Sequence, residues 1–466
     1  MRGCAMRINY QLTPGALGQK IARLWELSEE KILEIESLYD HPNGPPVFTE
    51  RGRFVPREWT DWTRGFQYGS SLLQFDATGD TRFLELGRAR TLERMTPHLT
   101  HLGADDHGFN NVSTFGNLLR LAAEGRIDAS TWERHFYELA MKVSGAVQAS
   151  RWSTVADGGG FIYSLNGPHS LFSDTIRSCR ALALAHQLGH RLLVEGDVTV
   201  SLLERLIQHA RSTARYNVYF GEGRDLYDVR GRVVHESIFN TKDGRYRCPS
   251  TQQGYSPFST WTRGLAWVML GFAELLEFIE SLSNTELAPF GDKRDIAREF
   301  LVTVKATSDF SLFHSALDGV PYWDTGAPGL SRMGDYLSRP ADPFNEHEPV
   351  DSSAAAIAAQ ALLRLGHYLV SRNDAEGGRR YFQAGLTIAD TLLGPPYLSA
   401  LPDHQGLLLH SVCFRPKAWD AQPSGHRVPC GESSMWGDYH FRELVLLIGR
   451  EANGGPYPKF FLETSA

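Results

Sequence analysis

The chain of 466 residues has the composition of an ordinary globular protein, with 42% hydrophobic and 22% charged residues, which argues against a disordered or fibrous protein. Its formal net charge of −7, and the lack of a basic cluster in the sequence, argue against nucleic acid as the main partner. No run approaches the roughly 18 apolar residues of a membrane-spanning helix, so we expect no membrane partner.

The N-terminal residues and the cysteines give an indication of the cellular compartment. The first fifteen residues lack the apolar core of a secretory signal peptide, which predicts a cytoplasmic protein, or a periplasmic one if a signal has been removed. The cysteines are odd in number and lack the close paired spacing of a zinc site. We therefore expect free thiols and no bound metal at Cys4, Cys179, Cys248, Cys413 and Cys430.

Helical periodicity dominates the chain, and strand-like alternation is scarce. Residues 198–215 place an apolar stripe opposite charged residues, which is typical of a half-exposed outer helix, whereas 352–365 is apolar nearly all round, as in a helix enclosed by others. We predict twelve helices in which even-numbered members are inner and odd-numbered members are outer: 12–39, 62–76, 80–97, 112–124, 128–151, 174–188, 198–218, 260–281, 290–313, 352–371, 374–394 and 433–450.

The connections alternate in the same way. Those that leave inner helices are short, as at 78–80 and 124–128, and short connections join antiparallel neighbours. Those that enter inner helices are long, and loops such as 218–259 and 315–350, without periodicity of their own, are expected to shape a functional site. The sequence therefore predicts an all-α (α/α)6 barrel, a six-hairpin toroid with its long loops on one rim. No linker divides the pattern, so we expect a single domain over residues 1–466.

A tetrapeptide, Trp-Thr-Arg-Gly, stands at 62–65 and again at 261–264, each time at the start of an inner helix. Other polar motifs occupy equivalent positions, and each supplies Asp, Ser or Thr where a helix N-cap is wanted, so capping explains each one taken alone. Together they would face one cleft. These motifs are ADDHGFNN at 104–111, LFSDTIRS at 171–178, VDSSAAA at 350–356 and GESSMWGDYHF at 431–441.

The residues at this rim suit an acidic carbohydrate. Helix N-termini that converge on one cleft favour an anionic ligand, and Arg64 and Arg263 would reinforce that preference. Tryptophans offer flat apolar faces with one polar edge, which suit the mixed surface of a sugar ring. Four are expected in the cleft: Trp62, Trp261, Trp267 and Trp436.

Two carboxylates, Asp106 and Asp174, would open inner helices at the same rim. Paired carboxylates in a low-dielectric cleft can differ in pKa, so that one stays protonated and serves as a general acid. The alternative is that Asp174 only caps its helix and that Asp105 is a solvated turn residue. His235 and Gln253, on the longest loop, are by themselves more typical of packed or solvated residues.

Taken in order, these motifs resemble those of the unsaturated glucuronyl hydrolases, glycoside hydrolase family 88, and more distantly those of the unsaturated rhamnogalacturonyl hydrolases. The resemblance runs from about Trp62 to Leu446. DWTRGFQYG is similar to the family's Trp-Thr-x-Gly-Phe motif and DDHGF to its His-Asp-Leu-Gly-Phe motif. QGYSPFSTWTRGLAW is similar to the family segment that begins Gln-Gly-Tyr-Ser and ends Arg-Gly-Gln-Ala-Trp.

The resemblance implies an (α/α)6 barrel and a glycoside hydrolase that acts by hydration. Such an enzyme releases a 4,5-unsaturated uronic acid from the non-reducing end of lyase-generated oligosaccharides, and needs no metal or organic cofactor. Asp174 corresponds to the general acid and base, and Asp106 to its supporting carboxylate. The positions that bind or orient the sugar correspond to Trp62, His235, Gln253, Trp261, Arg263 and Trp267.

Three residues depart from the family pattern: Asp105 replaces a histidine, Leu265 a glutamine and Ser178 an asparagine, and Arg64 is an extra arginine in the first motif. A second carboxylate beside Asp106 would raise the pKa of that residue by like-charge repulsion. The departures leave open a hydrolase of saturated uronides or other glycosides on the same scaffold, a sugar epimerase, and a non-catalytic carbohydrate-binding homologue. No oligomeric state is predicted.

Overall fold

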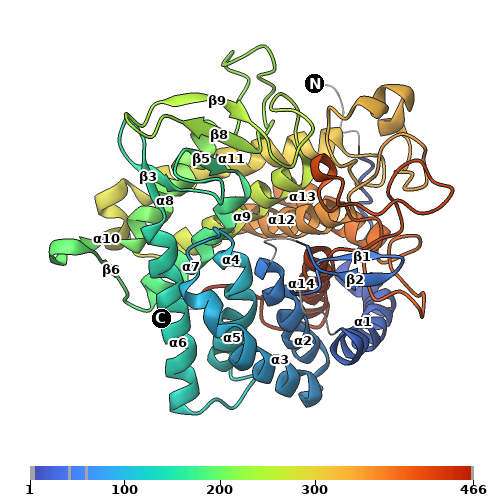
Figure 1. The fold of residues 1–466 in the computed structure, drawn as a ribbon, viewed down its shortest axis with the longest axis horizontal. Coiled ribbons are helices and arrows are strands. Elements are labelled where there is room, and N and C mark those ends of the chain that lie inside the picture. The colour runs from blue at the N-terminus through green and yellow to red at the C-terminus, as the bar shows by residue number, and fades with distance from the viewer. Residues whose placement is uncertain (1–5, 40–43, 58–60, 463–466) are drawn as a thin grey trace.

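The computed structural model describes residues 6–39, 44–57 and 61–462, so that Cys4 lies outside the described residues. Long helices alternate between an outer and an inner position along the chain (Figure 1). The outer helices are α1 (Gly18–Leu38), α3 (Thr81–Arg94), α6 (Thr131–Ser150), α8 (Leu202–Tyr216), α11 (Lys293–His314) and α13 (Ala375–Leu392). A short helix that was not predicted, α10 (Asn284–Leu287), precedes α11.

The inner helices pack in a closed ring. Two of them begin with a short helical piece: α4 (His107–Asn110) is joined to α5 (Asn117–Ala123) by a π-helical turn, η4 (Val112–Gly116), and α7 (Cys179–Gln187) follows the 3-10 turn η5 (Asp174–Ser178). Around the ring, α2 contacts η4, α4 contacts η5, η5 contacts α9, α9 contacts α12, α12 contacts α14, and α14 returns to α2. The predicted (α/α)6 barrel is confirmed. The remaining inner helices are α2 (Arg64–Thr78), α9 (Thr262–Ser281), α12 (Ser352–Ser371) and α14 (Met435–Ala452).

Burial along the helices follows their apolar patterns. In α12 every residue from Ser352 to Gly366 is buried, as expected of a helix enclosed on all sides. In α8 burial is restricted to one face, because only that stripe turns toward the barrel. The apolar residues of this stripe are Leu202, Leu203, Leu206, Ile207 and Ala210.

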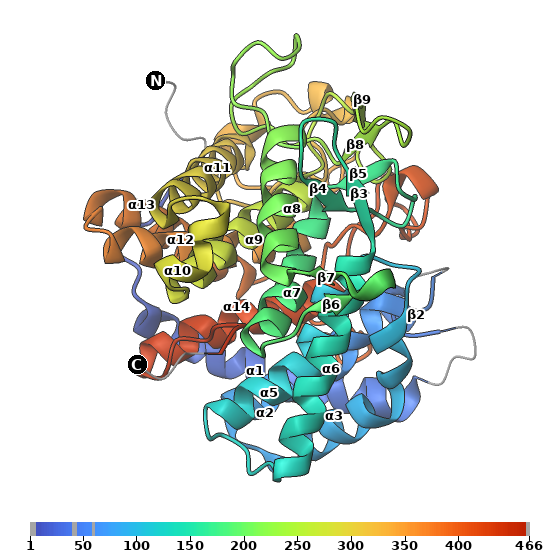
Figure 2. The same ribbon diagram turned by 90° about the vertical axis from the view of Figure 1, so that its left-hand side faces the viewer.

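The long loop 218–259 has secondary structure that was not predicted. β8 (Glu236–Phe239) and β9 (Tyr246–Ser250) form an antiparallel hairpin, and β5 (Ser170–Phe172) adds to it with Phe172 opposite Glu236. Figure 2 shows these strands gathered on one side of the molecule, beside β3 (Trp152–Thr154) and β4 (Gly160–Ile162). Strands of three to five residues are too short to reveal an alternating pattern in the sequence. Two further pairs join β1 (Phe48–Glu50) to β2 (Arg53–Val55), and β6 (Leu192–Leu193) to β7 (Thr199–Val200).

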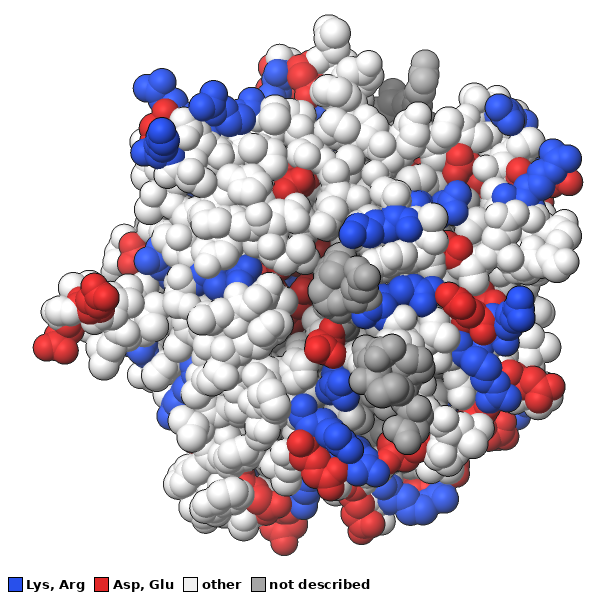
Figure 3. Space-filling view, viewed as in Figure 1, with Lys and Arg blue, Asp and Glu red and all other residues white. Residues whose placement is uncertain are grey.

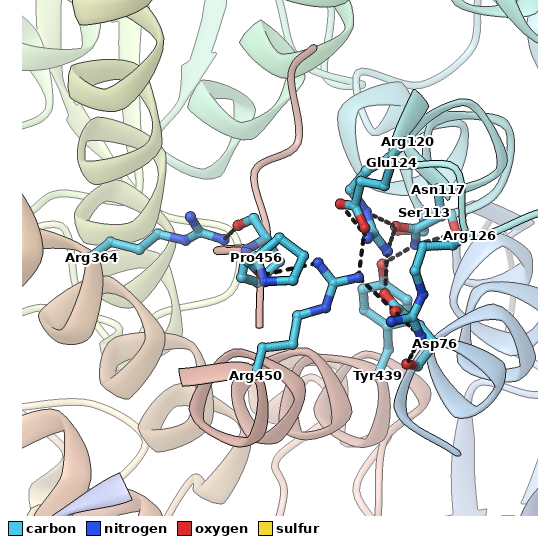
Figure 4. A network of polar contacts seen from close by, with 11 residues as sticks. Asp76, Ser113, Asn117, Arg120, Glu124, Arg126, Arg364, Tyr439, Arg450 and Pro456 are labelled. Carbon is cyan, nitrogen blue, oxygen red and sulfur yellow. Dashed lines mark hydrogen bonds and ion pairs between the residues drawn. The ribbon is translucent and has the colours of Figure 1, made fainter. Parts of the chain in front are cut away.

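A buried ionic network joins the carboxyl ends of three inner helices (Figure 4). Asp76 of α2 accepts hydrogen bonds from Arg120 of α5 at 2.8 Å and from Arg450 of α14 at 2.6 Å. Glu124 also pairs with both arginines. Burial alone would raise the pKa of Asp76, but the charges of Arg120 and Arg450 hold it below its ordinary value. The network therefore links the first and the last inner helices of the chain.

Three further observations concern the described residues only. None of their helices is long and apolar enough to cross a membrane. They contain no group of three or more His, Cys, Asp or Glu side chains placed to hold a metal ion. The four described cysteines carry free thiols, as expected.

Candidate active site

A pocket of about 620 Å³ opens to solvent at the rim where the inner helices begin. Five of the six inner helices contribute a residue at or next to their first turn: Trp62, Asp106, Asp174, Trp261 and Trp436. The sixth, α12, contributes indirectly through its N-cap residue Asp351, which pairs with the pocket residue Arg263. Figure 3, viewed from the same side as Figure 1, shows acidic and basic residues interspersed on that face.

The repeated Trp-Thr-Arg-Gly motif is explained by two close approaches at the starts of α2 and α9. A Cβ atom on Gly65 would lie 2.2 Å from the main-chain oxygen of Asn110, and one on Gly264 would lie 2.6 Å from the ring of Trp261. Neither position has room for a side chain: at Gly65 the main chain of α4 packs closely against α2, and at Gly264 the ring of Trp261 lies over the first turn of its own helix. In both copies, the tryptophan three residues before the glycine lines the pocket.

Aromatic side chains make up half of the residues that line the pocket. Trp62 and Trp436 are stacked with their centroids 5.6 Å apart, and Phe109 lies edge-on to Trp267 at 4.8 Å. Tryptophan and phenylalanine rings give the lining a large apolar surface, which suits the C–H face of a sugar ring. The structure therefore places all four predicted tryptophans, Trp62, Trp261, Trp267 and Trp436, around the pocket.

Asp174 lies at the centre of the polar part of the site. It is the first residue of η5 and follows the N-cap residue Ser173, so capping does not account for it. Its Oδ1 atom is buried without a hydrogen-bond partner among the described residues. Burial first, and then the charge of Asp105, raise the pKa of Asp174 to about 7. A carboxyl group with this pKa is protonated in a large share of molecules at neutral pH and in most of them below it.

His235 lies next to Asp174 but does not line the pocket. Its Nδ1 atom accepts a hydrogen bond from the main-chain N–H of Gln252 at 2.9 Å, so the proton of the neutral ring is on Nε2. That Nε2 lies 3.7 Å from Asp174 Oδ1. Burial, followed by the charge of Arg263, lowers the pKa of His235 to about 3, so the ring is neutral at ordinary pH.

Asp106 lines the pocket at the start of α4, where its side chain makes no capping hydrogen bond. Burial, followed by the charges of Asp105 and Asp174, raises the pKa of Asp106 well above its ordinary value. The direction expected from like-charge repulsion with Asp105 is thus borne out. Capping explains Asp351 and Ser434, which do bond the first turns of their helices, but not Asp106 or Asp174.

Asp105 is not a solvated turn residue, which corrects one sequence interpretation. It is 3% exposed and lines the pocket beside Asp106. Its carboxylate accepts hydrogen bonds from the main chain of Leu165 and from the hydroxyl of Thr175. The other two departures from the family pattern are outside the pocket: Ser178 donates its hydroxyl to the carbonyl of Asp105, and Leu265 is buried in the core.

Arg263 lines the pocket but is fully engaged with the protein. It donates to Asp351 at 2.6 Å, to the carbonyls of Val412 and Cys413 at 2.6 and 2.8 Å, and to Gln253 at 3.4 Å. Its guanidinium also lies over the rings of two pocket tryptophans. The arginine therefore fixes the loop at 412–413 against α9 and α12, and it holds the side-chain oxygen of Gln253, another predicted pocket residue.

Arg64 is the predicted site residue that the structure places elsewhere. Its guanidinium lies 3.5 Å from the exposed Asp61, and it does not line the pocket. Trp62 lies in the 3-10 turn η2 (Asp61–Thr63), whereas Trp261 is the extended N-cap residue of α9, so the main chain takes a different path through the two copies. The two copies of the motif thus place their arginines differently, although they place their tryptophans alike.

Besides Asp105, seven pocket residues were not named as site residues from the sequence. Phe109 and Phe172 occur inside motifs already singled out, at 104–111 and 171–178, so their motifs gave a signal. The others come from loops whose paths carry no periodic pattern, and nothing in the sequence indicated them. These are Val47, Leu165, Cys413, Phe414 and Trp419.

Comparison with known proteins bears on this site. No family model matches the chain. The unsaturated glucuronyl hydrolase of Bacillus sp. strain GL1 is 26% identical over 420 residues, which cover 89% of this chain and 93% of that protein. The predicted resemblance to unsaturated glucuronyl hydrolases is confirmed.

Two further similarities extend the comparison. An unsaturated chondroitin disaccharide hydrolase of Streptococcus pyogenes serotype M1 is 23% identical over 419 residues, covering 89% of this chain and 87% of that one. The crystal structure of an unsaturated glucuronyl hydrolase specific for heparin superposes with a TM-score of 0.69 at 19% identity, covering 95% of this chain and 99% of the other. The unsaturated glucuronyl hydrolases therefore share the barrel of this chain along nearly its whole length.

Proposed function

We propose that the protein is a glycoside hydrolase that releases a 4,5-unsaturated uronic acid from the non-reducing end of oligosaccharides produced by polysaccharide lyases. The observation that carries this proposal is Asp174, a carboxyl group whose pKa is raised to about 7 in a pocket walled by tryptophans. Such a group can give a proton to carbon at neutral pH. The similarity to unsaturated glucuronyl and chondroitin disaccharide hydrolases supports the same substrate class.

In the proposed reaction Asp174 transfers its proton to C4 of the unsaturated uronate, and the positive charge that develops is shared by C5 and the ring oxygen. Water then adds at C5 and gives its proton to the Asp174 carboxylate, which restores the acid. The resulting hemiketal at C5 opens, and C1 then releases the neighbouring sugar as an alcohol. Overall, one water molecule is consumed and Asp174 returns to its starting state.

The neighbours of Asp174 have separate roles in this proposal. The Nε2–H group of His235, 3.7 Å from Oδ1, faces the carboxylate that forms when Asp174 loses its proton. Burial and the neighbouring carboxylates raise the pKa of Asp106, which favours the protonated form, able to donate a hydrogen bond to the anionic substrate. The stacked Trp62 and Trp436 hold the apolar face of a sugar.

The alternatives left open by the sequence receive less support. Of the three departures from the family pattern, only Asp105 lines the pocket, so Ser178 and Leu265 do not reshape it toward a saturated uronide. A protein that only bound carbohydrate would have no use for a carboxyl group with a raised pKa beside a neutral histidine. Within the described residues, the inner helices form one closed ring. We propose that residues 1–466 act as one catalytic domain.

The test uses the ultraviolet absorbance of the conjugated double bond. The purified protein is incubated with 4,5-unsaturated disaccharides from pectin, glycosaminoglycan, ulvan and gellan lyases. Loss of absorbance with at least one product is expected, and Asp174→Asn should not cause it while keeping the same circular dichroism spectrum. Persistence of absorbance across the panel, with cleavage of saturated uronides instead, would replace this proposal by the saturated-uronide alternative.

A further inference from the structure

Asp105 joins three parts of the chain that meet at the pocket. Its Oδ1 atom accepts a hydrogen bond from the main-chain N–H of Leu165 at 3.2 Å, in the loop between β4 and β5. Its Oδ2 atom accepts one from the hydroxyl of Thr175 in η5, next to Asp174. Its main-chain carbonyl accepts another from the hydroxyl of Ser178, at the end of η5. Asp105 therefore fixes both η5 and the β4–β5 loop relative to the start of α4.

The carboxyl group of Asp105 is buried, which raises its own pKa, while the charge of Arg151 and the hydrogen bonds from Thr175 and Leu165 act to lower it and so favour the carboxylate. The side chain is 3% exposed, and it forms no ion pair within 4 Å with another described residue. The nearby cation is Arg151, whose guanidinium is engaged with the carbonyls of Tyr163 and Ser164 at 2.9 and 3.1 Å. A buried carboxylate that is not directly paired exerts a strong field on its neighbours, because little solvent screens it.

We propose that Asp105 is a positioning residue for Asp174, which it holds in place through Thr175 and whose proton it retains through its own negative charge. This inference rests on the proposed role of Asp174 as the general acid. The family pattern has a histidine at this position, so Asp105 would give this chain a way of its own to keep the acid protonated.

The charged and titratable groups around Asp174 act on its pKa in both directions. His235 is neutral and presents only a hydrogen-bond donor. Glu236 on β8 acts in the same direction as Asp105, and Arg263 on α9 acts in the opposite direction. Asp106 shares the pocket, and its own pKa is raised by both neighbouring carboxylates after burial. After burial, Asp105 has the largest influence on the pKa of Asp174.

The test compares two nearly isosteric substitutions. Asp105→Asn removes the charge but keeps an acceptor for Leu165 and a partner for Thr175. The alkaline limb of the kcat profile is expected to move down by about 1 pH unit, which makes turnover at pH 8 about tenfold slower. The matched control, Thr175→Val, removes the hydrogen bond and keeps the charge. It should lower kcat at every pH without moving the limb.

A second measurement does not depend on turnover. The titration of the Asp174 carboxyl is followed by infrared difference spectroscopy, with its band assigned by comparison with Asp174→Asn. A midpoint that falls in Asp105→Asn supports the inference, even if no lyase product is hydrolysed and the proposed function fails. An unchanged midpoint in a folded Asp105→Asn protein overturns the inference, whether or not the wild-type protein is active.

Discussion

The Nε2 atom of His235 lies 3.7 Å from Asp174 Oδ1, and the other nitrogen of the ring accepts hydrogen bonds from the main chain of Gln252 and Gln253. The main chain of this loop thus determines the tautomer of the histidine, which presents an N–H group to the proposed acid. A donor in this position stabilises the carboxylate of Asp174 more than its protonated form.

Replacement of His235 by alanine should therefore slow the step in which Asp174 loses its proton. We expect kcat to fall by about 100-fold, the usual effect of removing one donor that stabilises developing charge. Steady-state kinetics on the preferred lyase product would measure it. His314→Ala serves as the control, because burial also lowers the pKa of His314, which lies on the outer helix α11 and does not line the pocket. If both variants lose activity equally, the loss comes from disturbed packing and not from the missing N–H group.

Activity should depend on pH through Asp174. Because this group must be protonated to act, and its pKa is about 7, kcat should be nearly constant well below pH 7 and fall about tenfold per unit well above it. The profile is best recorded with saturating substrate, so that it reports the enzyme–substrate complex. A limb that persists unchanged in the residual activity of Asp174→Asn would assign the titration to another group.

The raised pKa of Asp174 should make the folded protein less stable at high pH. The pKa of Asp174 is higher in the folded than in the unfolded state, so its contribution to stability is complete below the unfolded pKa, near 4, and is lost as pH rises through 7. The asparagine side chain of the Asp174→Asn variant cannot ionise, so this variant does not lose stability in the same way. At pH 8 the inactive variant should exceed wild type in free energy of unfolding by about 2 to 4 kcal/mol, with a smaller difference at pH 5. Denaturant titrations at both pH values test this, and equal stability at pH 8 would contradict it.

Arg263 should behave as a residue that shapes the pocket. Removing it leaves Asp351 buried without its partner and frees the loop at 412–413, so Arg263→Ala should lower the free energy of unfolding by about 3 to 5 kcal/mol. We expect KM to rise and kcat to fall together, since Cys413 and Phe414 line the pocket. Arg263→Lys should rescue little, because an ammonium group cannot reproduce the several directed hydrogen bonds of a guanidinium. A rise in KM alone, with unchanged stability, would favour direct binding of substrate by Arg263.

The ionic network at the other end of the barrel should show the opposite pH dependence to Asp174. The pKa of Asp76 is lowered in the folded protein, so its contribution is present above the unfolded pKa and is lost as pH falls below about 4. Asp76→Asn should cost about 3 to 5 kcal/mol at pH 7 and less at pH 3.5. Glu299→Gln, which breaks the exposed pair with Arg211, should cost under about 1 kcal/mol and provides the control.

Much of this architecture could be predicted because helices longer than four turns have a clear periodic pattern of apolar residues. The enclosed position of 352–371 and the one-sided stripe of 202–210 follow from the distribution of apolar residues. The order of long and short connections then determines which helix ends share a rim. The β8–β9 hairpin could not be recovered in this way, because its strands are stabilised by pairing with each other and with β5 rather than by a local pattern.

The site was predictable to the extent that its residues sit at helix starts. Asp106, Asp174 and Trp261 were placed correctly because each stands at or just before the first turn of an inner helix. Cys413, Phe414 and Trp419 come from a loop that reaches the pocket by contacts remote in sequence, such as those with Arg263. Arg64 shows the limit of motif repetition, since it pairs with Asp61 outside the pocket, whereas the arginine of the identical tetrapeptide at 261–264 lines the pocket.

The stacking of Trp62 on Trp436 has a consequence for how the protein is made. These rings lie at the starts of the first and the last inner helices, so the two halves of this wall are more than 370 residues apart in the chain. During synthesis on the ribosome, both proposed catalytic carboxyls emerge long before that wall exists. The ability to hold a sugar should therefore arise late, once α14 has docked against α2, and nascent chains lacking α14 should be inactive however well their earlier helices have formed.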